Sequence, residues 1–78
     1  MDYELIKKNV EQIAERVLDR SIHLIDADRL LHEQGLDEFD LLQIIMDIED
    51  HFNIIIDDEI LPQLQSIRQI CQYLLDIV

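Results

Sequence analysis

The stretch that decides the fold is Gly35–Phe52, "GLDEFDLLQIIMDIEDHF", at the middle of the 78-residue chain. It opens with carboxylates, continues through Leu, Ile and Met, and contains no Lys or Arg. Apolar side chains recur there at spacings of three and four, which predicts an amphipathic helix. The residues that we expect on its core face are Leu41, Ile44, Ile45, Ile48 and Phe52.

The start of this helix is predicted at Asp37 or Glu38. The carboxylate of Asp37 can accept a hydrogen bond from a free backbone N–H group of the first turn. Asp40 falls in that first turn, where the helix dipole favours a negative charge. Gly35, which tolerates positive φ, is expected to end the preceding segment.

Polar residues form one stripe along the helix, with spacings of three, four and three. They are Asp40, Gln43, Asp47 and Asp50. Leu42 and Met46, one turn apart, fall at the edge of this stripe. Two interpretations stay open: they are exposed apolar contacts beside the acids, or they are core residues of a helix that is buried over most of its circumference.

A first helix is predicted from Asp2 to Leu18, with a core face of Ile6, Val10, Ile13, Val17 and Leu18. An irregular stretch, Asp19 to Leu36, follows it. We expect a short helical turn there around Asp28 to Glu33. The apolar residues expected to anchor the stretch are Ile22, Leu24, Ile25, Leu30 and Leu31.

The segment "NIIID", Asn53 to Asp57, has the composition of a strand but no second strand pattern with which to pair. We therefore predict an extended connector with Ile56 buried. Ile54 and Ile55 form an exposed apolar patch for another protein, or one of them fills the core.

A short helix around Asp58 to Gln63, interrupted near Pro62, is expected next. The last helix begins with a predicted capping box, in which Ser66 caps and Gln69 reaches back to the N–H of the cap. Its core face comprises Ile67, Ile70, Cys71, Leu74 and Ile77. The predicted fold is an all-α bundle of three main helices, with one short helix before the last, in a single domain spanning residues 1–78.

The formal net charge is −12, from 6 basic and 18 acidic residues. This charge disfavours binding to nucleic acid and to anionic membrane surfaces. Cys71 is the only cysteine, so no intramolecular disulfide is possible. The N-terminal residues lack the apolar segment of a signal peptide, and no run approaches eighteen apolar residues, so we expect a cytoplasmic protein.

Little in the sequence points to catalysis or metal binding. The three histidines, His23, His32 and His51, are not spaced as metal ligands. Asp26 and Asp28 begin like a calcium loop, but its sixth position is Leu31 instead of glycine. Neither a phosphate-binding glycine loop nor a nucleophile–base pair is evident. We predict no enzyme activity and no metal site.

Several motifs together resemble the acyl carrier proteins and their relatives in peptide- and polyketide-synthesis systems. They are "GLD" at 35–37, the apolar series Leu41, Leu42, Ile45, Met46 and Ile48, "IEDHF" at 48–52, "DDE" at 57–59 and "LQSIRQICQYL" at 64–74. The resemblance runs without a gap from Gly35 through Leu74. It is looser before Gly35. It implies a carrier fold in which the second helix is presented to partner enzymes.

One departure from the family pattern bears on function. In the family, "D-S-L" opens the second helix and its serine carries a 4′-phosphopantetheine arm. Here the triplet is Asp37-Glu38-Phe39, and residues 35–43 contain no Ser, Thr, Tyr or Cys. We therefore expect no phosphopantetheine cofactor. Ser21, Ser66 and Cys71 are the alternative attachment points that we considered, and none has the context of the family motif.

The resemblance implies that the residues of the docking surface are Asp37, Asp40, Leu42, Met46, Asp47, Glu49 and Asp50. We add Glu38 to this surface, because its carboxylate is a fixed negative charge. Either Glu38 imitates the charge of the modified serine, or it is simply a good first-turn residue. We predict a non-enzymatic, usually monomeric protein that docks basic biosynthetic enzymes. The alternatives are a carrier loaded through an unusual residue and a structural helix bundle that self-associates through Ile54, Ile55 and Leu42.

Overall fold

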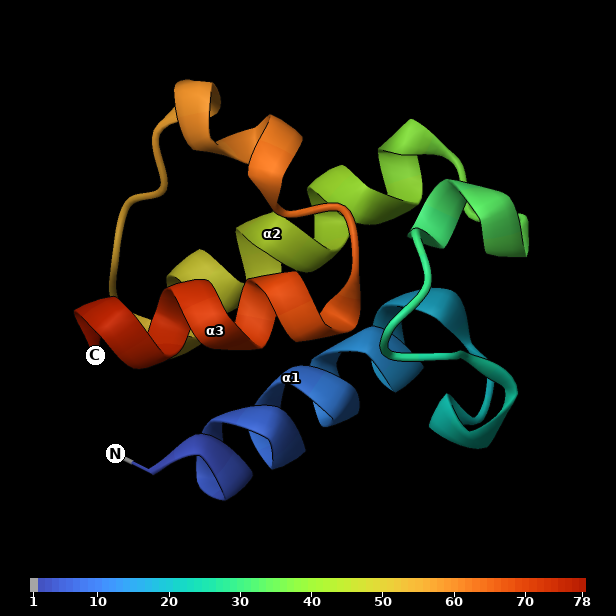
Figure 1. Cartoon of the computed structure of the whole chain (residues 1–78), viewed down its shortest axis with the longest axis horizontal. Coiled ribbons are helices and arrows are strands. Elements are labelled where there is room, and N and C mark those ends of the chain that lie inside the picture. Colours follow the sequence, from blue (N-terminus) through green and yellow to red (C-terminus); the bar gives the residue numbers. More distant parts are fainter. Residues whose placement is uncertain (1) are drawn as a thin grey trace.

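The computed structural model of the chain describes residues 2–78. Within that range the chain forms three α-helices and three short 3₁₀ helices, with no strand (Figure 1). In chain order they are α1 (Tyr3–Leu18), η1 (Ile22–Leu24), η2 (Leu31–Gln34), α2 (Glu38–Phe52), η3 (Asp58–Gln63) and α3 (Ile67–Ile77). The predicted all-α class, with a short helix between α2 and α3, is confirmed.

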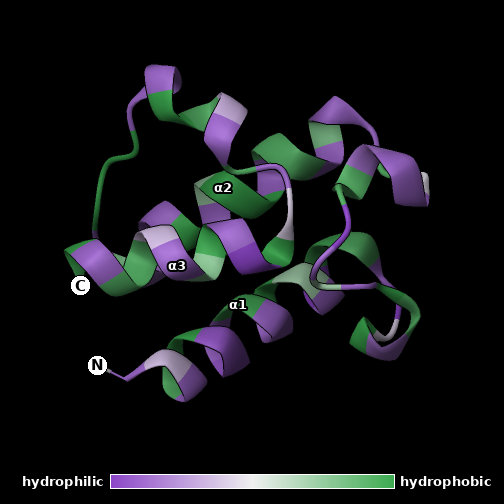
Figure 2. Ribbon diagram, viewed as in Figure 1, coloured by the Kyte–Doolittle hydropathy of each residue, from purple (hydrophilic) through white to green (hydrophobic). Residues whose placement is uncertain are grey.

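The core lies between the three α-helices, and α1 packs against both α2 and α3. Each helix buries an apolar face and turns polar residues outward, so both classes of residue alternate along every helix (Figure 2). The side chains that are no more than 2 % exposed include Ile6, Val10, Ile13, Ala14, Leu31, Ile44, Ile48, Leu64, Ile67, Ile70, Cys71 and Leu74. No helix in residues 2–78 is long and apolar enough to cross a bilayer.

The start of α2 is fixed by a reciprocal capping box. The Asp37 carboxylate accepts the N–H of Asp40 at 2.9 Å, and the Asp40 carboxylate accepts the N–H of Asp37 at 3.3 Å. The predicted cap at Asp37 is therefore confirmed, whereas the return bond from Asp40 was not foreseen. Both carboxylates satisfy backbone donors that the helix itself leaves free.

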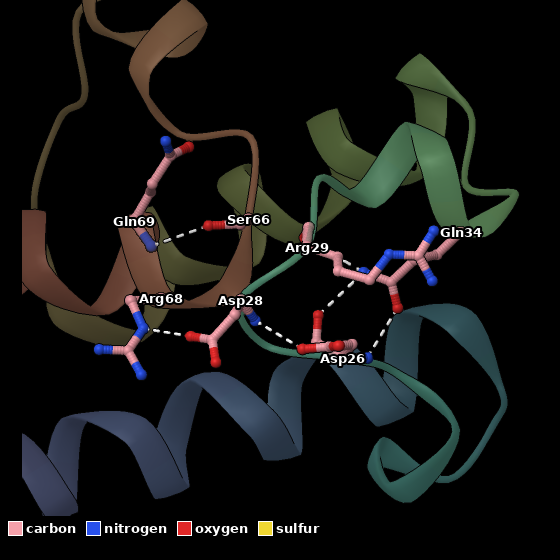
Figure 3. A network of polar contacts seen from close by, with 7 residues as sticks. All are labelled: Asp26, Asp28, Arg29, Gln34, Ser66, Arg68 and Gln69. Atoms are coloured by element: carbon pink, nitrogen blue, oxygen red, sulfur yellow. Dashed lines mark hydrogen bonds and ion pairs between the residues drawn. The ribbon is translucent and has the colours of Figure 1, made fainter.

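The cap of α3 is confirmed in one half and wrong in the other. The buried Ser66 hydroxyl accepts the N–H of Gln69 at 3.1 Å, as predicted (Figure 3). The Gln69 side chain, however, does not return to the N–H of Ser66. Its amide oxygen accepts the N–H of Gln65 at 2.8 Å, since that donor lies within its reach just after the end of η3.

The connection between α1 and α2 is organised by Gln34. Its side-chain oxygen accepts the N–H of Asp26 at 2.7 Å, and its NH₂ group donates to the carbonyl oxygens of Asp26 and Arg29 (Figure 3). These contacts close the loop that precedes η2. Gly35 then takes φ 88°, which confirms the predicted positive φ at this position.

The same loop is fastened to the start of α3. The N–H of Leu31 donates to the carbonyl of Gln65 at 2.8 Å, and the N–H of Arg68 donates to the carbonyl of Ala27 at 2.9 Å. The Arg68 guanidinium also donates to the Asp28 carboxylate (Figure 3). That hydrogen bond and the charge of Asp28 raise the pKa of Arg68 above its ordinary value. The carboxylate of this calcium-like segment therefore faces an arginine.

Three sequence-based expectations are wrong in detail. Leu24 is 74 % exposed because η1, a turn that was not predicted, directs it outward. Ile77 is 45 % exposed because α3 ends there, beyond the part of the helix that packs in the core. Pro62 does not interrupt η3, which runs on to Gln63, because a 3₁₀ helix loses a single backbone hydrogen bond at a proline. In addition, the turn expected at 28–33 lies at Leu31–Gln34.

Cys71 lies on the core face of α3, as predicted, and its side chain is fully buried. Burial, assisted by the negative charge of Glu11, raises the pKa of the Cys71 thiol from 9.0 to about 11. The thiol is consequently protonated and shielded at neutral pH. A group in this state is a poor nucleophile and a poor metal ligand.

The cap of α3 predicts a specific loss of stability. Ser66→Ala removes the acceptor for the N–H of Gln69, so we expect the free energy of unfolding to fall by about 1 kcal/mol. Urea titration followed by circular dichroism measures it. Ser21→Ala is the control, since the exposed Ser21 hydroxyl caps only the three-residue η1. Equal losses for the two variants would contradict a special role for Ser66.

The buried thiol predicts a pH dependence in alkali. The folded pKa is raised, so between about pH 9 and pH 11 the folded chain holds a proton that the unfolded chain has lost. The free energy of unfolding should fall with pH in that window, by at most about 1.4 kcal/mol per pH unit from this group. Cys71→Ala should unfold more easily at neutral pH but lack this part of the slope. Identical slopes in both proteins would contradict the assignment.

Candidate functional site

The outward face of α2 carries an apolar ridge. Burial of Ile44, Ile45 and Ile48 fixes the rotation of the helix about its own axis. With 3.6 residues per turn, the opposite face then holds residues 39, 42 and 46. Phe39 is 81 % exposed, Leu42 38 % and Met46 56 %. We call these three side chains the apolar ridge.

The ridge resolves the two interpretations that the sequence left open. Leu42 and Met46 are exposed, so they are not ordinary core residues. Phe39 belongs with them, although the sequence analysis did not include it among the docking residues. Its spacing of three to Leu42 and of seven to Met46 was the available signal.

Carboxylates flank the ridge on both sides. Helical geometry places Glu38 and Glu49 along one flank, and Asp40 and Asp47 along the other. Asp50 continues the line of the ridge one turn beyond Met46. Leu42 and Met46 thus border the predicted polar stripe on one side and a second acidic flank, Glu38 and Glu49, on the other.

Most of these carboxylates have structural partners. Asp37 and Asp40 form the capping box. Glu49 accepts the N–H of Ile56 at 2.8 Å and so ties the following connector to α2. Asp47 accepts a hydrogen bond from the Gln43 amide at 2.9 Å and lies 3.9 Å from the Arg16 guanidinium of α1.

Glu38 and Asp50 differ from the other acids of the site. Within residues 2–78, neither has a side-chain hydrogen bond or an ion pair, and both are exposed. Glu38 is also the first residue of α2, where the free N–H groups of the helix favour a negative charge. These two carboxylates can therefore meet an external cation without giving up an internal contact.

The connector after α2 separates its isoleucines. Ile56 is buried, as predicted, and Ile54 is half-buried against the core. Ile55 points outward and is 90 % exposed. The second of the two interpretations is therefore confirmed: Ile54 helps to fill the core, and Ile55 alone remains at the surface.

A groove of about 570 Å³ opens beside the N-terminal half of α2. Its apolar lining comes from η2, the connection that follows it, α2 and η3: Leu31, Leu36, Leu41, Leu42, Leu61 and Pro62. Asp37, Glu38 and Asp58 stand among the polar lining residues, together with His32 and Gln65. Leu42 and Glu38 thus border the groove and also belong to the outward face of α2.

No serine or cysteine of the chain lies at the start of α2. Residues 35–43, which include the start of α2, contain no hydroxyl or thiol group. Ser66 is buried and holds the cap of α3, and Cys71 is buried and protonated. Ser21 is exposed, but its hydroxyl accepts the N–H of His23 in η1, away from α2 in the chain.

The described residues offer no metal centre either. No three of their His, Cys, Asp and Glu side chains are placed to hold an ion. In the segment that begins like a calcium loop, the Asp26 carboxylate accepts the N–H of Asp28 at 2.9 Å, and Asp28 pairs with Arg68. The chemistry of the site is consequently that of an acidic and apolar protein surface.

The comparisons with known proteins agree with this arrangement. The family model described as "Phosphopantetheine attachment site" matches residues 8–74, which include the whole of α2, the groove and most of α3. The curated proteins and the solved structures gave no match. Since the family match covers most of the chain, it identifies the family. The chain belongs to the phosphopantetheine-attachment domains, the family of the acyl carrier proteins.

Proposed function

We propose that this protein is an acyl-carrier-like docking protein that lacks the phosphopantetheine arm. The observation that supports this most strongly is Glu38. It is the first residue of α2 and is exposed, and the resemblance aligns it with the serine of the family's "D-S-L" motif. The carrier fold and its outward helix are present, whereas the nucleophile at that position is not.

The chemistry of the position separates a carboxylate from an alcohol. A serine hydroxyl attacks the pyrophosphate of coenzyme A and leaves a stable phosphodiester. A glutamate carboxylate making the same attack would give a mixed anhydride, which water hydrolyses. Glu38 therefore cannot hold a durable arm. Its fixed charge at the helix N-terminus is compatible with the fold, because an anion is favoured there.

The docking function rests on the apolar ridge and its acidic flanks. The net charge of −12 raises the rate at which a cationic partner finds the protein, and the free carboxylates of Glu38 and Asp50 pair with that partner. Phe39, Leu42 and Met46 supply apolar contact at short range. Methionine adapts well to irregular surfaces, so Met46 suits a partner with such a surface.

The proposed partners are basic-surfaced enzymes or transferases of fatty-acid, polyketide or related biosynthesis. On this proposal the protein is cytoplasmic, forms one domain, and regulates or assembles those enzymes without catalysing a reaction itself. Self-association is the competing function, and the exposure of Ile55 is the observation that favours it. Sedimentation over a range of concentrations separates the two, since self-association predicts a stable dimer.

The missing alcohol predicts the outcome of a loading reaction. We expect no covalent gain when the protein is incubated with coenzyme A and a phosphopantetheinyl transferase of broad specificity. Glu38→Ser should gain the mass of one phosphopantetheine group, because it restores the hydroxyl at the start of a carrier helix. Intact-protein mass spectrometry measures both results.

Glu38→Gln is the matched control, since it removes the charge without adding a hydroxyl and should stay unmodified. Transfer of an arm to the wild-type chain would contradict the proposal and would support a carrier loaded elsewhere. Peptide mapping of that product would then distinguish Ser21, Ser66 and Cys71.

The free carboxylates predict which charges matter for docking. A photo-crosslinking amino acid at position 39 should capture a basic biosynthetic enzyme when the protein is expressed in its native cells. Reversing Glu38 and Asp50 to Lys should lower the yield of that product about tenfold or more, because both favourable pairings become repulsive. Mass spectrometry identifies the product, and gel densitometry measures the yield.

The double variant Glu4→Lys and Glu15→Lys is the control, because both residues are exposed on α1 and the change in net charge is the same. An equal loss of yield in both double variants would mean that net charge alone drives the encounter. That result would contradict a docking site on α2.

A further inference from the structure

The groove beside α2 has three walls, formed by η2, α2 and η3. η2 contributes Leu31, α2 contributes Leu41 and Leu42, and η3 contributes Leu61. The hydrogen bond from the N–H of Leu31 to the carbonyl of Gln65 joins η2 to the segment after η3. A backbone contact therefore holds two of the three walls of the groove together.

The lining of the groove specifies the chemistry of its occupant. Its leucines and proline favour an apolar group. The charged groups among the lining residues are the carboxylates of Asp37, Glu38 and Asp58, and neither Lys nor Arg lines the groove. A free fatty acid would bring its carboxylate beside these three. The charge complementarity thus favours an apolar group that is joined to cationic groups.

We propose that the groove receives an apolar side chain from a basic segment of the partner protein, with Lys or Arg residues beside it pairing with Glu38 and Asp58. This inference rests on the proposed docking function and extends it. It assigns the partner a protruding aliphatic side chain between cations. Leu42 and Glu38 lie on both the groove and the outward face of α2, so one segment can contact the ridge and fill the groove together.

Charge pairing and apolar contact contribute to this binding in ways that differ in their dependence on salt. Cationic side chains meet the acidic rim at the surface, where salt screens them. The aliphatic side chain enters a groove whose floor includes the buried Leu31 and Leu36, and its contribution is less sensitive to salt. A segment with the same charges but no apolar residue should therefore bind more weakly, and the difference should persist at moderate salt.

Two synthetic peptides of equal charge test this. One has the sequence Arg-Lys-Leu-Lys-Arg, and the other has glycine in place of leucine. We expect the leucine peptide to bind about tenfold more tightly in fluorescence anisotropy titrations. In methyl nuclear magnetic resonance spectra it should shift the signals of Leu36 and Leu61, while those of the distant Leu24 and the connector residue Ile55 stay in place.

Variants of the groove and of the ridge locate the binding. Leu61→Gln makes one wall of the groove polar and should abolish the advantage of the leucine peptide. Met46→Gln, which alters the ridge outside the groove, should keep it. Circular dichroism establishes that each variant is folded. Because Leu61 also packs against the core, the methyl shifts of the wild-type protein decide the result if Leu61→Gln does not fold.

Equal affinity for the two peptides would overturn the groove proposal and leave the proposed docking function standing, since charge alone would then direct the encounter. Shifts confined to Met46 and Ile55 would overturn it as well. Failure of the leucine peptide to bind would also count against it. Loading of the wild-type chain with phosphopantetheine contradicts the proposed function instead, so the two failures are distinguishable.

Discussion

The rotation of α2 about its axis is the constraint on which the rest of the structure depends. Ile44, Ile45 and Ile48 bury one side of the helix, and the capping box of Asp37 and Asp40 fixes where it starts. Once the start and the buried side are set, every other side chain has an assigned direction. The chain must then expose its apolar ridge to water, because moving the ridge inward would expel the isoleucines. An exposed ridge between acids is thus a consequence of the same packing that holds the fold.

The acidic residues at the start of α2 and along it differ in their internal contacts. Asp37, Asp40 and Glu49 accept hydrogen bonds from backbone N–H groups, so neutralising them affects the helix start or the connector. Glu38 and Asp50 carry the same formal charge without such internal contacts. A family-wide docking pattern does not reveal this division, since it records only that a position is acidic. Charge variants of the first group consequently mix folding and binding effects, whereas those of the second break no internal hydrogen bond or ion pair.

The helices were predictable from the sequence because each obeys a local rule. Periodic apolar residues marked α1 and α2, and the Ser66 cap marked the start of α3. The features that escaped prediction depend on contacts between distant segments. η1 exposes Leu24, Gln34 closes the loop before η2, and the groove needs η2, α2 and η3 together. None of these leaves a periodic signal in one stretch of sequence. Phe39 is the exception, since its spacing to Leu42 was visible and was not used.

A glutamate in place of the attachment serine, as proposed here, would not disturb the start of α2 or the packing of the core. The first turn of a helix accepts an anionic side chain readily, and Glu38 supports no core contact that a serine would have to replace. The residue at position 38 can therefore prevent attachment of the phosphopantetheine arm without preventing the chain from folding. Without a tethered arm, nothing covalent determines what enters the neighbouring groove. On our proposal its occupant is then selected by the lining alone, and three carboxylates around an apolar floor favour a cationic partner with an apolar side chain over a free fatty acid, whose carboxylate they would repel.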